Sequence, residues 1–203
     1  MRFVTAIRDT RRPDALPDDA TLGAEGNERL TAWTGTALLL GFAAEGLTIL
    51  DVHWYLKWHL IIGYALLLPV GLKLASTGYR FARYYTGTPA YRRKGPPRPL
   101  LRVLGPVLVL LTVGVLATGV GLEVLPSSYH FRLEQLHKLS FIAWFGVTAV
   151  HVLAYVWRLP RLMIADLLVR GTRGSAAAQR IVLVAASGVL GLGLGYVLYA
   201  TVK

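Results

Sequence analysis

Two histidines, His137 and His151, stand at the ends of the apolar stretch HKLSFIAWFGVTAVH. Fourteen residues of α-helix make about 3.9 turns and rise about 21 Å, so both side chains are expected on one helix face. Phe141, Trp144 and Thr148 are expected between them on that face. A histidine in a membrane-spanning helix is costly and usually faces the bundle interior with a function. The alternative is a pair of histidines that only hydrogen-bond neighbouring helices.

A second apolar stretch repeats this spacing, from His59 to Lys73. Both stretches are expected to run from the outer to the inner side of a membrane, so their helices are parallel. His59 should then face His137, and Lys73 should lie at the depth of His151. A haem held by two axial ligands needs such facing residues at matching depths. We therefore expect an outer haem on His59 and His137.

Lys73 is the unusual member of this set. The chain has no cysteine, both methionines lie outside the expected spans, and no fourth intramembrane histidine is left to face His151. A ligating amine must be neutral, and burial favours the neutral form of a lysine. Lys73 is thus the best candidate to share an inner haem iron with His151. The alternative is that its amine extends to the nearby headgroups, which would leave the inner haem five-coordinate or absent.

Small residues repeat the same spacing on two further stretches. Gly105 and Gly119 are fourteen apart, as are Ala32 and Gly46. Small residues let a helix approach a neighbour or a flat ligand closely. We expect Gly46, Gly105 and Gly119 to lie against the porphyrins.

Four more polar residues lie near the outer ends of these stretches. Glu45 and Glu123 could take a proton from a quinol or hydrogen-bond a partner, or else reach the headgroups or pair with a nearby lysine or arginine. His53 and His130 are expected to be exposed or interfacial rather than part of a quinone, partner or metal site.

Five apolar segments must position these residues. The chain has 203 residues, of which 54% are hydrophobic, and a bilayer core needs about 20 apolar residues per helix. Segments of this length run roughly from 30 to 50, 57 to 77, 103 to 124, 137 to 157 and 181 to 200. The expected fold is all-α, an integral membrane four-helix haem-binding bundle plus a fifth transmembrane helix. We expect a cytoplasmic tail at 1–28, the haem domain at 29–157, a cytoplasmic basic loop at 158–180 and the fifth helix at 181–203.

Most basic residues fall in alternate loops. The formal net charge of +11 also suits nucleic-acid binding, but that requires a basic face on a soluble fold, so no nucleic-acid partner is expected. The positive-inside rule places the basic loops in the cytoplasm, hence the N-terminus inside and Lys203 outside an inner membrane. The residues before the first span do not look like a cleavable signal peptide. The basic residues on this side are Arg2, Arg8, Arg11, Arg12, Arg29, Arg80, Arg83, Arg92, Arg93, Lys94, Arg98, Arg102, Arg158, Arg161, Arg170, Arg173 and Arg180.

Two features predict how the helices pack. Pro69 is expected to kink the second span and free a backbone carbonyl that the bundle must satisfy. The GLGLG sequence in the fifth span favours close packing on the bundle or on a partner subunit, with contact to lipid as the alternative.

The paired H-x13-[HK] spacing resembles that of membrane-bound b-type cytochromes, the four-helix di-haem proteins related to cytochrome b561 and to the cytochrome b subunits of hydrogenases and formate dehydrogenases. The H-x13-H helix is also similar to the haem-bearing helices of the respiratory-complex cytochrome b. The resemblance covers roughly residues 30 to 157. It implies two b-type haems that carry electrons between a quinone pool and a redox partner, such as a molybdenum-containing oxidoreductase. Lys73 departs from it, because such proteins usually offer histidine there.

These observations favour an electron-transfer subunit over a complete enzyme, because the chain has no nucleotide-binding glycine loop and no flavin motif. Two alternatives stay open. One is a stand-alone quinone-linked or metal-ion reductase with an outer site at Glu45, Glu123 or His130. The other is a haem-free membrane anchor subunit.

Overall fold

The computed structural model describes residues 23–93, 95, 99–168 and 172–202. Most of the predicted cytoplasmic tail lies outside the described residues, as do Lys94, Arg98 and Arg170 and the side chain of Arg173. The described part is helical and contains no strand, which confirms the all-α prediction.

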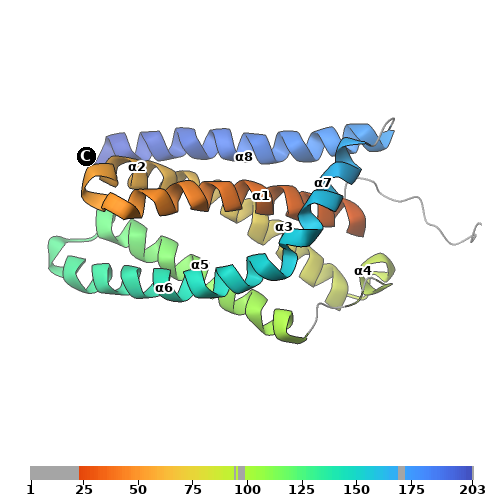
Figure 1. The fold of residues 1–203 in the computed structure, drawn as a ribbon, viewed down its shortest axis with the longest axis horizontal. Coiled ribbons are helices and arrows are strands. Elements are labelled where there is room, and N and C mark those ends of the chain that lie inside the picture. The colour runs from red at the N-terminus through yellow and green to blue at the C-terminus, as the bar shows by residue number, and fades with distance from the viewer. Residues whose placement is uncertain (1–22, 94, 96–98, 169–171, 203) are drawn as a thin grey trace, which may run out of the picture.

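Eight α-helices and three short 3₁₀ turns make up this part of the chain (Figure 1). Four helical stretches are long and apolar enough to cross a membrane, namely Ala24–Tyr85, Pro99–Val124, Ser127–Leu167 and Ala176–Thr201. The length and composition of these stretches are those of a multi-pass membrane protein. The elements are α1 (Ala24–Thr48), η1 (Ile49–Asp51), α2 (Val52–Ala65), α3 (Leu67–Tyr85), α4 (Pro89–Arg93), α5 (Pro99–Val124), η2 (Ser127–Tyr129), α6 (His130–Tyr155), η3 (Val156–Arg158), α7 (Leu159–Leu167) and α8 (Thr172–Val202).

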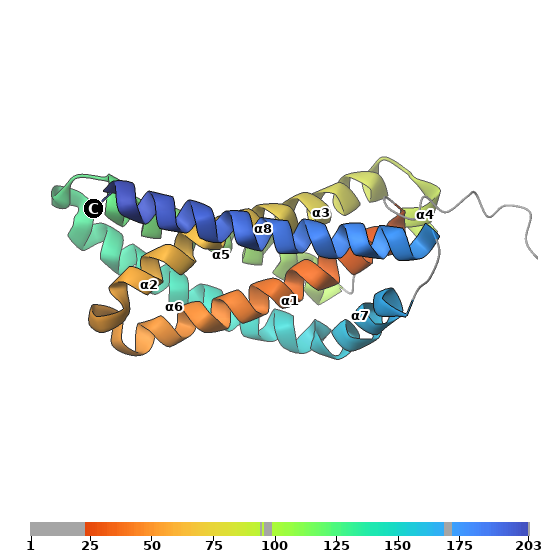
Figure 2. The same ribbon diagram turned by 90° about the horizontal axis from the view of Figure 1, so that it is seen from above.

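The first of the four stretches contains two of the five predicted spans. The chain reverses direction at η1, so that α2 and α3 return alongside α1 (Figures 1 and 2). Asp51 starts the return helix, because its side chain accepts a hydrogen bond from the backbone N–H of Trp54 at 3.2 Å. A carboxylate at this position satisfies a donor that the first helical turn leaves free.

The helices form two groups. One group is the antiparallel pair α5 and α6, and the other contains α1, α2, α3 and α8 (Figure 1). Leu38, Leu66 and Val70 form the buried core of the second group. Large apolar side chains such as Leu110 and Phe145 face outward on the α5–α6 pair, as expected for helices that lie against lipid.

Helix α8 packs directly on the backbone of α2. A Cβ atom added to Gly191 would collide with the carbonyl oxygen of Ala65, and one added to Gly195 would collide with that of Ile61. Pro69 has no N–H to bond the Ala65 carbonyl, which is four residues earlier. The predicted kink therefore occurs at Leu66, between α2 and α3, and Gly191 of α8 covers the carbonyl that it exposes. The prediction of close packing by the GLGLG sequence is confirmed, with the chain's own bundle as the partner.

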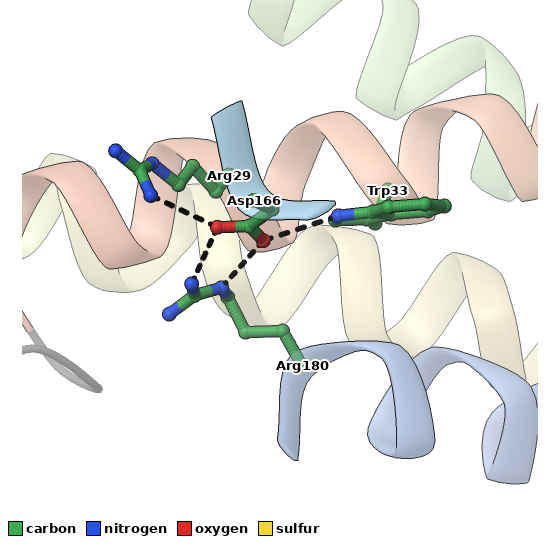
Figure 3. A network of polar contacts seen from close by, with 4 residues as sticks. All are labelled: Arg29, Trp33, Asp166 and Arg180. Atoms are coloured by element: carbon green, nitrogen blue, oxygen red, sulfur yellow. Dashed lines mark hydrogen bonds and ion pairs between the residues drawn. The ribbon is translucent and has the colours of Figure 1, made fainter. Parts of the chain in front are cut away.

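Helix α7 lies in the segment expected to be a basic loop, and α8 also begins there, at Thr172. The contacts of Asp166 explain why α7 packs against α1 and α8. Its carboxylate is fully buried and accepts hydrogen bonds from Arg29 and Trp33 of α1 and from Arg180 of α8 (Figure 3). The shortest of these joins Oδ1 to the Arg180 guanidinium at 2.6 Å. Asp166 thus joins α7, α1 and α8 through one carboxylate.

The two ends of the molecule differ in charge. The turns η1 and η2 lie at one end, whereas α4 and α7 lie at the other (Figure 1). The described basic residues of the second and fourth predicted loops all belong to the α4 and α7 end. This segregation is the charge asymmetry on which the positive-inside rule operates.

Candidate functional site

His59 and His137 lie opposite each other, one from each helix group. His59 is in the second half of α2 and His137 is near the start of α6. Their ring centroids are 6.3 Å apart and their ring planes are nearly perpendicular, at 82°. Both side chains are partly buried. The fold therefore brings together the two histidines that the sequence analysis assigned to one depth.

The hydrogen bonds of His59 fix its tautomer. Its Nδ1 lies 2.9 Å from the Thr48 hydroxyl and 2.9 Å from Oε1 of Glu45. The Thr48 hydroxyl already donates its hydrogen to the backbone carbonyl of Glu45 at 2.5 Å, so it can only accept from the imidazole. The Nδ1 atom of His59 consequently carries a proton and donates it, so in the neutral imidazole the lone pair lies on Nε2.

His137 is held in the same tautomer by different groups. Its Nδ1 lies 3.0 Å from the carbonyl oxygen of Val115 and 3.1 Å from the Thr118 hydroxyl, both on α5. The carbonyl can only accept, and Thr118 already donates to the carbonyl of Gly114 at 2.7 Å. The Nδ1 atom of His137 is therefore also a donor, and Nε2 again keeps its lone pair.

These two histidines fit the axial positions of one haem. Among the described residues, neither Nε2 atom has a hydrogen-bond partner, and both lone pairs belong to rings that the protein orients from the Nδ1 side, as is usual for metal-ligating histidines. A metal–nitrogen bond is about 2 Å long, and a five-membered ring with bonds of about 1.3 Å has its atoms about 1.1 Å from its centre. Two imidazoles on opposite sides of one iron then have centroids about 6 Å apart. The observed 6.3 Å agrees with that arrangement, and perpendicular planes are compatible with two rings on one axis.

The same distance also suits a direct edge-to-face contact of two aromatic rings, which spans about 4.5 to 7 Å. A direct contact explains the ring separation. In both histidines the Nδ1–H group is turned toward an acceptor on a neighbouring helix, which leaves the two Nε2 atoms without a protein partner among the described residues.

Glu45 lies beside His59, a contact that the sequence did not predict. The sequence left open an exchange of protons with a quinol, a hydrogen bond to a partner, a headgroup contact and a pair with a lysine or arginine, whereas in the fold the carboxylate contacts His59. Lys138 instead pairs with Glu134 at 2.5 Å. The second oxygen of Glu45, Oε2, is buried and has no hydrogen-bond partner among the described residues. A signal was present in the sequence, because the short turn at DVHWYLK places residue 45 of one helix near the depth of residue 59 of the next.

The inner pair is less closely assembled than the outer pair. The Lys73 amine donates a hydrogen bond to the backbone carbonyl of Thr31 at 2.6 Å and lies 3.0 Å from the point that a Cβ at Gly35 would occupy. It turns inward to α1 and does not extend toward the headgroups. His151 packs against Tyr155, with ring centroids 4.9 Å apart. Ligation by Lys73 therefore stays a prediction.

The three glycines assigned to the porphyrins occupy different surroundings. A Cβ at Gly119 would lie 3.1 Å from Cε1 of His137, so this glycine makes room for the imidazole ring itself. A Cβ at Gly46 or Gly105 would meet no heavy atom of the described residues within 4 Å. Contact of Gly46 and Gly105 with a macrocycle stays a prediction.

An aromatic cluster fills the level midway between the two histidines of α6. Trp144 is buried, packs against Phe42 of α1 with centroids 4.6 Å apart, and donates a hydrogen bond to the Thr112 hydroxyl at 3.0 Å. The buried hydroxyl of Thr148, on the same face of α6, has no partner among the described residues. These contacts connect α6 to α1 between the outer and inner levels.

The remaining two histidines lie away from this site. His53 is exposed, and exposed His130 donates from Nε2 to the carbonyl of Leu125 at 3.0 Å. His130 thereby satisfies a carbonyl at the end of α5. Glu123 makes no hydrogen bond or ion pair with any residue in the described ranges.

No group of three or more His, Cys, Asp and Glu side chains in the described part of the chain is placed to hold a metal ion by itself. Comparisons of the chain with protein-family models, with characterised proteins and with solved structures gave no match.

Proposed function

We propose that the chain is an electron-transfer subunit, a membrane cytochrome b in which His59 and His137 are the axial ligands of an outer b-type haem. One observation carries the proposal. Two histidines from different helix groups face each other at 6.3 Å with both Nδ1–H groups engaged and both Nε2 lone pairs free. A bound haem would supply reversible one-electron transfer.

The protein's own residues prepare this site before any ligand arrives. Thr48 and Glu45 orient His59, and Val115 and Thr118 orient His137, so that neither imidazole must change tautomer to bind iron. Gly119 allows the His137 ring to lie close to α5. The apolar outer faces of α5 and α6 suit a membrane, where a haem held by this pair could exchange electrons with lipid-soluble quinones.

The proposal extends to a second, inner haem on Lys73 and His151. The matched spacing of fourteen residues on α2–α3 and on α6 supports it. The Lys73 amine is directed into the bundle, where it donates to the Thr31 carbonyl of α1, and a ligating lysine would also have to turn its nitrogen toward His151. The expected redox partners are a quinone pool and a separate protein, such as a molybdenum-containing oxidoreductase.

A reduced-minus-oxidised absorption spectrum tests the proposal. The full chain would be expressed with an adequate haem supply and purified in detergent. One oxidised sample would then be reduced with dithionite, and a separate oxidised sample with a soluble quinol. We expect the absorption bands of a low-spin b-type haem after both treatments. A colourless protein would support the haem-free anchor and contradict the proposal. Continuous turnover of quinol with a metal-ion acceptor, without any added subunit, would favour the stand-alone reductase.

A further inference from the structure

The two facing histidines differ in the charge of their hydrogen-bond acceptors. His137 donates to a backbone carbonyl and a hydroxyl, both neutral. His59 donates to a hydroxyl and to the carboxylate of Glu45. The two rings are otherwise held alike, so Glu45 is the feature that makes this site asymmetric.

Glu45 is partly buried beside His59 and is held there by several contacts. Its side chain is 15% exposed and that of His59 is 20% exposed. The Thr48 hydroxyl bonds both the Glu45 backbone and the His59 ring, so the three residues form one connected group. A Cβ at Gly63 would lie 3.4 Å from the Glu45 carboxylate, which means that α2 leaves just enough room for it. Oε2 has no partner of its own, so His59 is the only hydrogen-bond donor to this carboxylate among the described side chains.

A carboxylate that accepts from the Nδ1–H of a ligating histidine has two effects. The charge-assisted hydrogen bond holds the ring more firmly than a neutral acceptor does. It also makes the ring a stronger electron donor to the metal, which favours the oxidised iron. The first effect changes how tightly a haem is held, and the second changes its reduction potential.

We propose that Glu45 is a positioning residue for His59 that lowers the reduction potential of the outer haem. This inference rests on the proposed function. It assigns the acid near the outer end of α1 to the support of a ligand and not to proton exchange with a quinol.

The experiment is a spectroscopic redox titration of the full chain in detergent, on the wild type and on Glu45→Gln, Glu45→Ala and Glu123→Gln. Glutamine keeps the shape of the side chain and an oxygen acceptor but removes the charge. Glu123→Gln removes a charge near the outer end of α5, where no bond to either histidine exists, and it measures the general effect of charge. The haem-to-protein ratio is recorded for each variant.

We expect Glu45→Gln to keep its haem and to be reduced more easily. At a fixed potential, its ratio of reduced to oxidised outer haem should rise about tenfold, equivalent to about 59 mV for one electron. Glu123→Gln should give a much smaller shift. Glu45→Ala should lower the affinity for haem by about 10-fold to 100-fold.

The failures are distinguishable. A wild type without haem contradicts the proposed function and this inference together. A wild type with haem whose potential is moved no more by Glu45→Gln than by Glu123→Gln contradicts only the role of Glu45. A Glu45→Gln variant that loses haem while the remaining haem keeps its potential shows a purely structural role, and also overturns the inference.

Discussion

The imidazole rings of His59 and His137 face each other with centroids 6.3 Å apart, although they belong to helix groups that make few close backbone contacts. Each ring is oriented from its own side: His59 by Glu45 and Thr48 of α1, and His137 by Val115 and Thr118 of α5. The two rings, with their Nε2 atoms, are therefore oriented by separate helices, α1 for His59 and α5 for His137. A haem between them would also join the two helix groups.

Among the glycines of α5, Gly119 should be the least tolerant of a larger side chain. Gly119→Ala places a methyl group 3.1 Å from Cε1 of His137, which is closer than a usual contact, so the ring must shift by a few tenths of an ångström. We expect the haem-to-protein ratio of the purified variant to fall at least several-fold. Gly114→Ala is the matched control on the same helix, because its Cβ would meet nothing within 4 Å. Equal haem content in both variants would contradict the position of His137 described above.

The packing of α8 on α2 gives a second prediction. Gly191→Ala and Gly195→Ala each place a methyl group against a backbone carbonyl of α2, which cannot move as a side chain can. Forced overpacking of this kind costs about 1 to 3 kcal/mol in the free energy of unfolding. Denaturant-induced unfolding in detergent micelles measures it. Gly193→Ala lies between the two in sequence, faces open space, and should leave the free energy of unfolding nearly unchanged. A loss of stability in Gly193→Ala as large as in the other two variants would be inconsistent with this packing.

Asp166 should carry much of the stability of the α7 end. Asp166→Asn removes the charge of the buried carboxylate that pairs with Arg180, whose side chain is only 7% exposed, and weakens the bonds to Arg29 and Trp33. Removing one partner of a buried ion pair costs about 3 to 5 kcal/mol in the free energy of unfolding. Glu134→Gln breaks the Glu134–Lys138 pair, whose side chains are 52% and 61% exposed, and it serves as the control. Its melting temperature should match that of the wild type. An Asp166→Asn variant as stable as Glu134→Gln would show that the buried network contributes little.

The proposal of a second haem depends on whether Lys73 is a ligand. Lys73→Ala removes the amine that donates to Thr31, and we expect the spectrum and potential of the inner haem to change while those of the outer haem stay the same. The control is Lys57→Ala, because Lys57 lies near the start of α2, over the rings of Trp58 and Tyr199. Unchanged spectra and potentials of both haems in Lys73→Ala would rule out the lysine ligand.

The sequence predicted the features that depend on periodicity and on single residue types. The all-α fold, the reversal after α1, the break near Pro69 and the close packing of GLGLG all follow from helix length, from the missing N–H of proline and from the missing side chain of glycine. The juxtaposition of His59 and His137 was predicted from matched depth alone.

The features that it did not predict depend on tertiary contacts. Asp166 lies in a segment that appeared to be a basic loop, and only the folded chain shows three donors from α1 and α8 around it. The contact between Glu45 and His59 depends on how α1 is rotated about its axis. Because α1 is only weakly amphipathic, its sequence pattern does not indicate which face turns toward α2. Gly119 lies against the His137 ring, a contact that depends on how closely α5 and α6 pack and that the sequence did not predict.

The haem-to-protein ratio of His59→Ala and His137→Ala tests whether the two facing histidines hold a haem, with His53→Ala and His130→Ala as matched controls. His53 is exposed at the start of α2, and His130 is exposed at the start of α6, so each control removes a histidine from the same helix without touching the facing pair. We expect both site variants to lose the outer haem and its absorption bands, while both controls keep the wild-type ratio. Wild-type haem content in His59→Ala and His137→Ala, or an equal loss in all four variants, would contradict it.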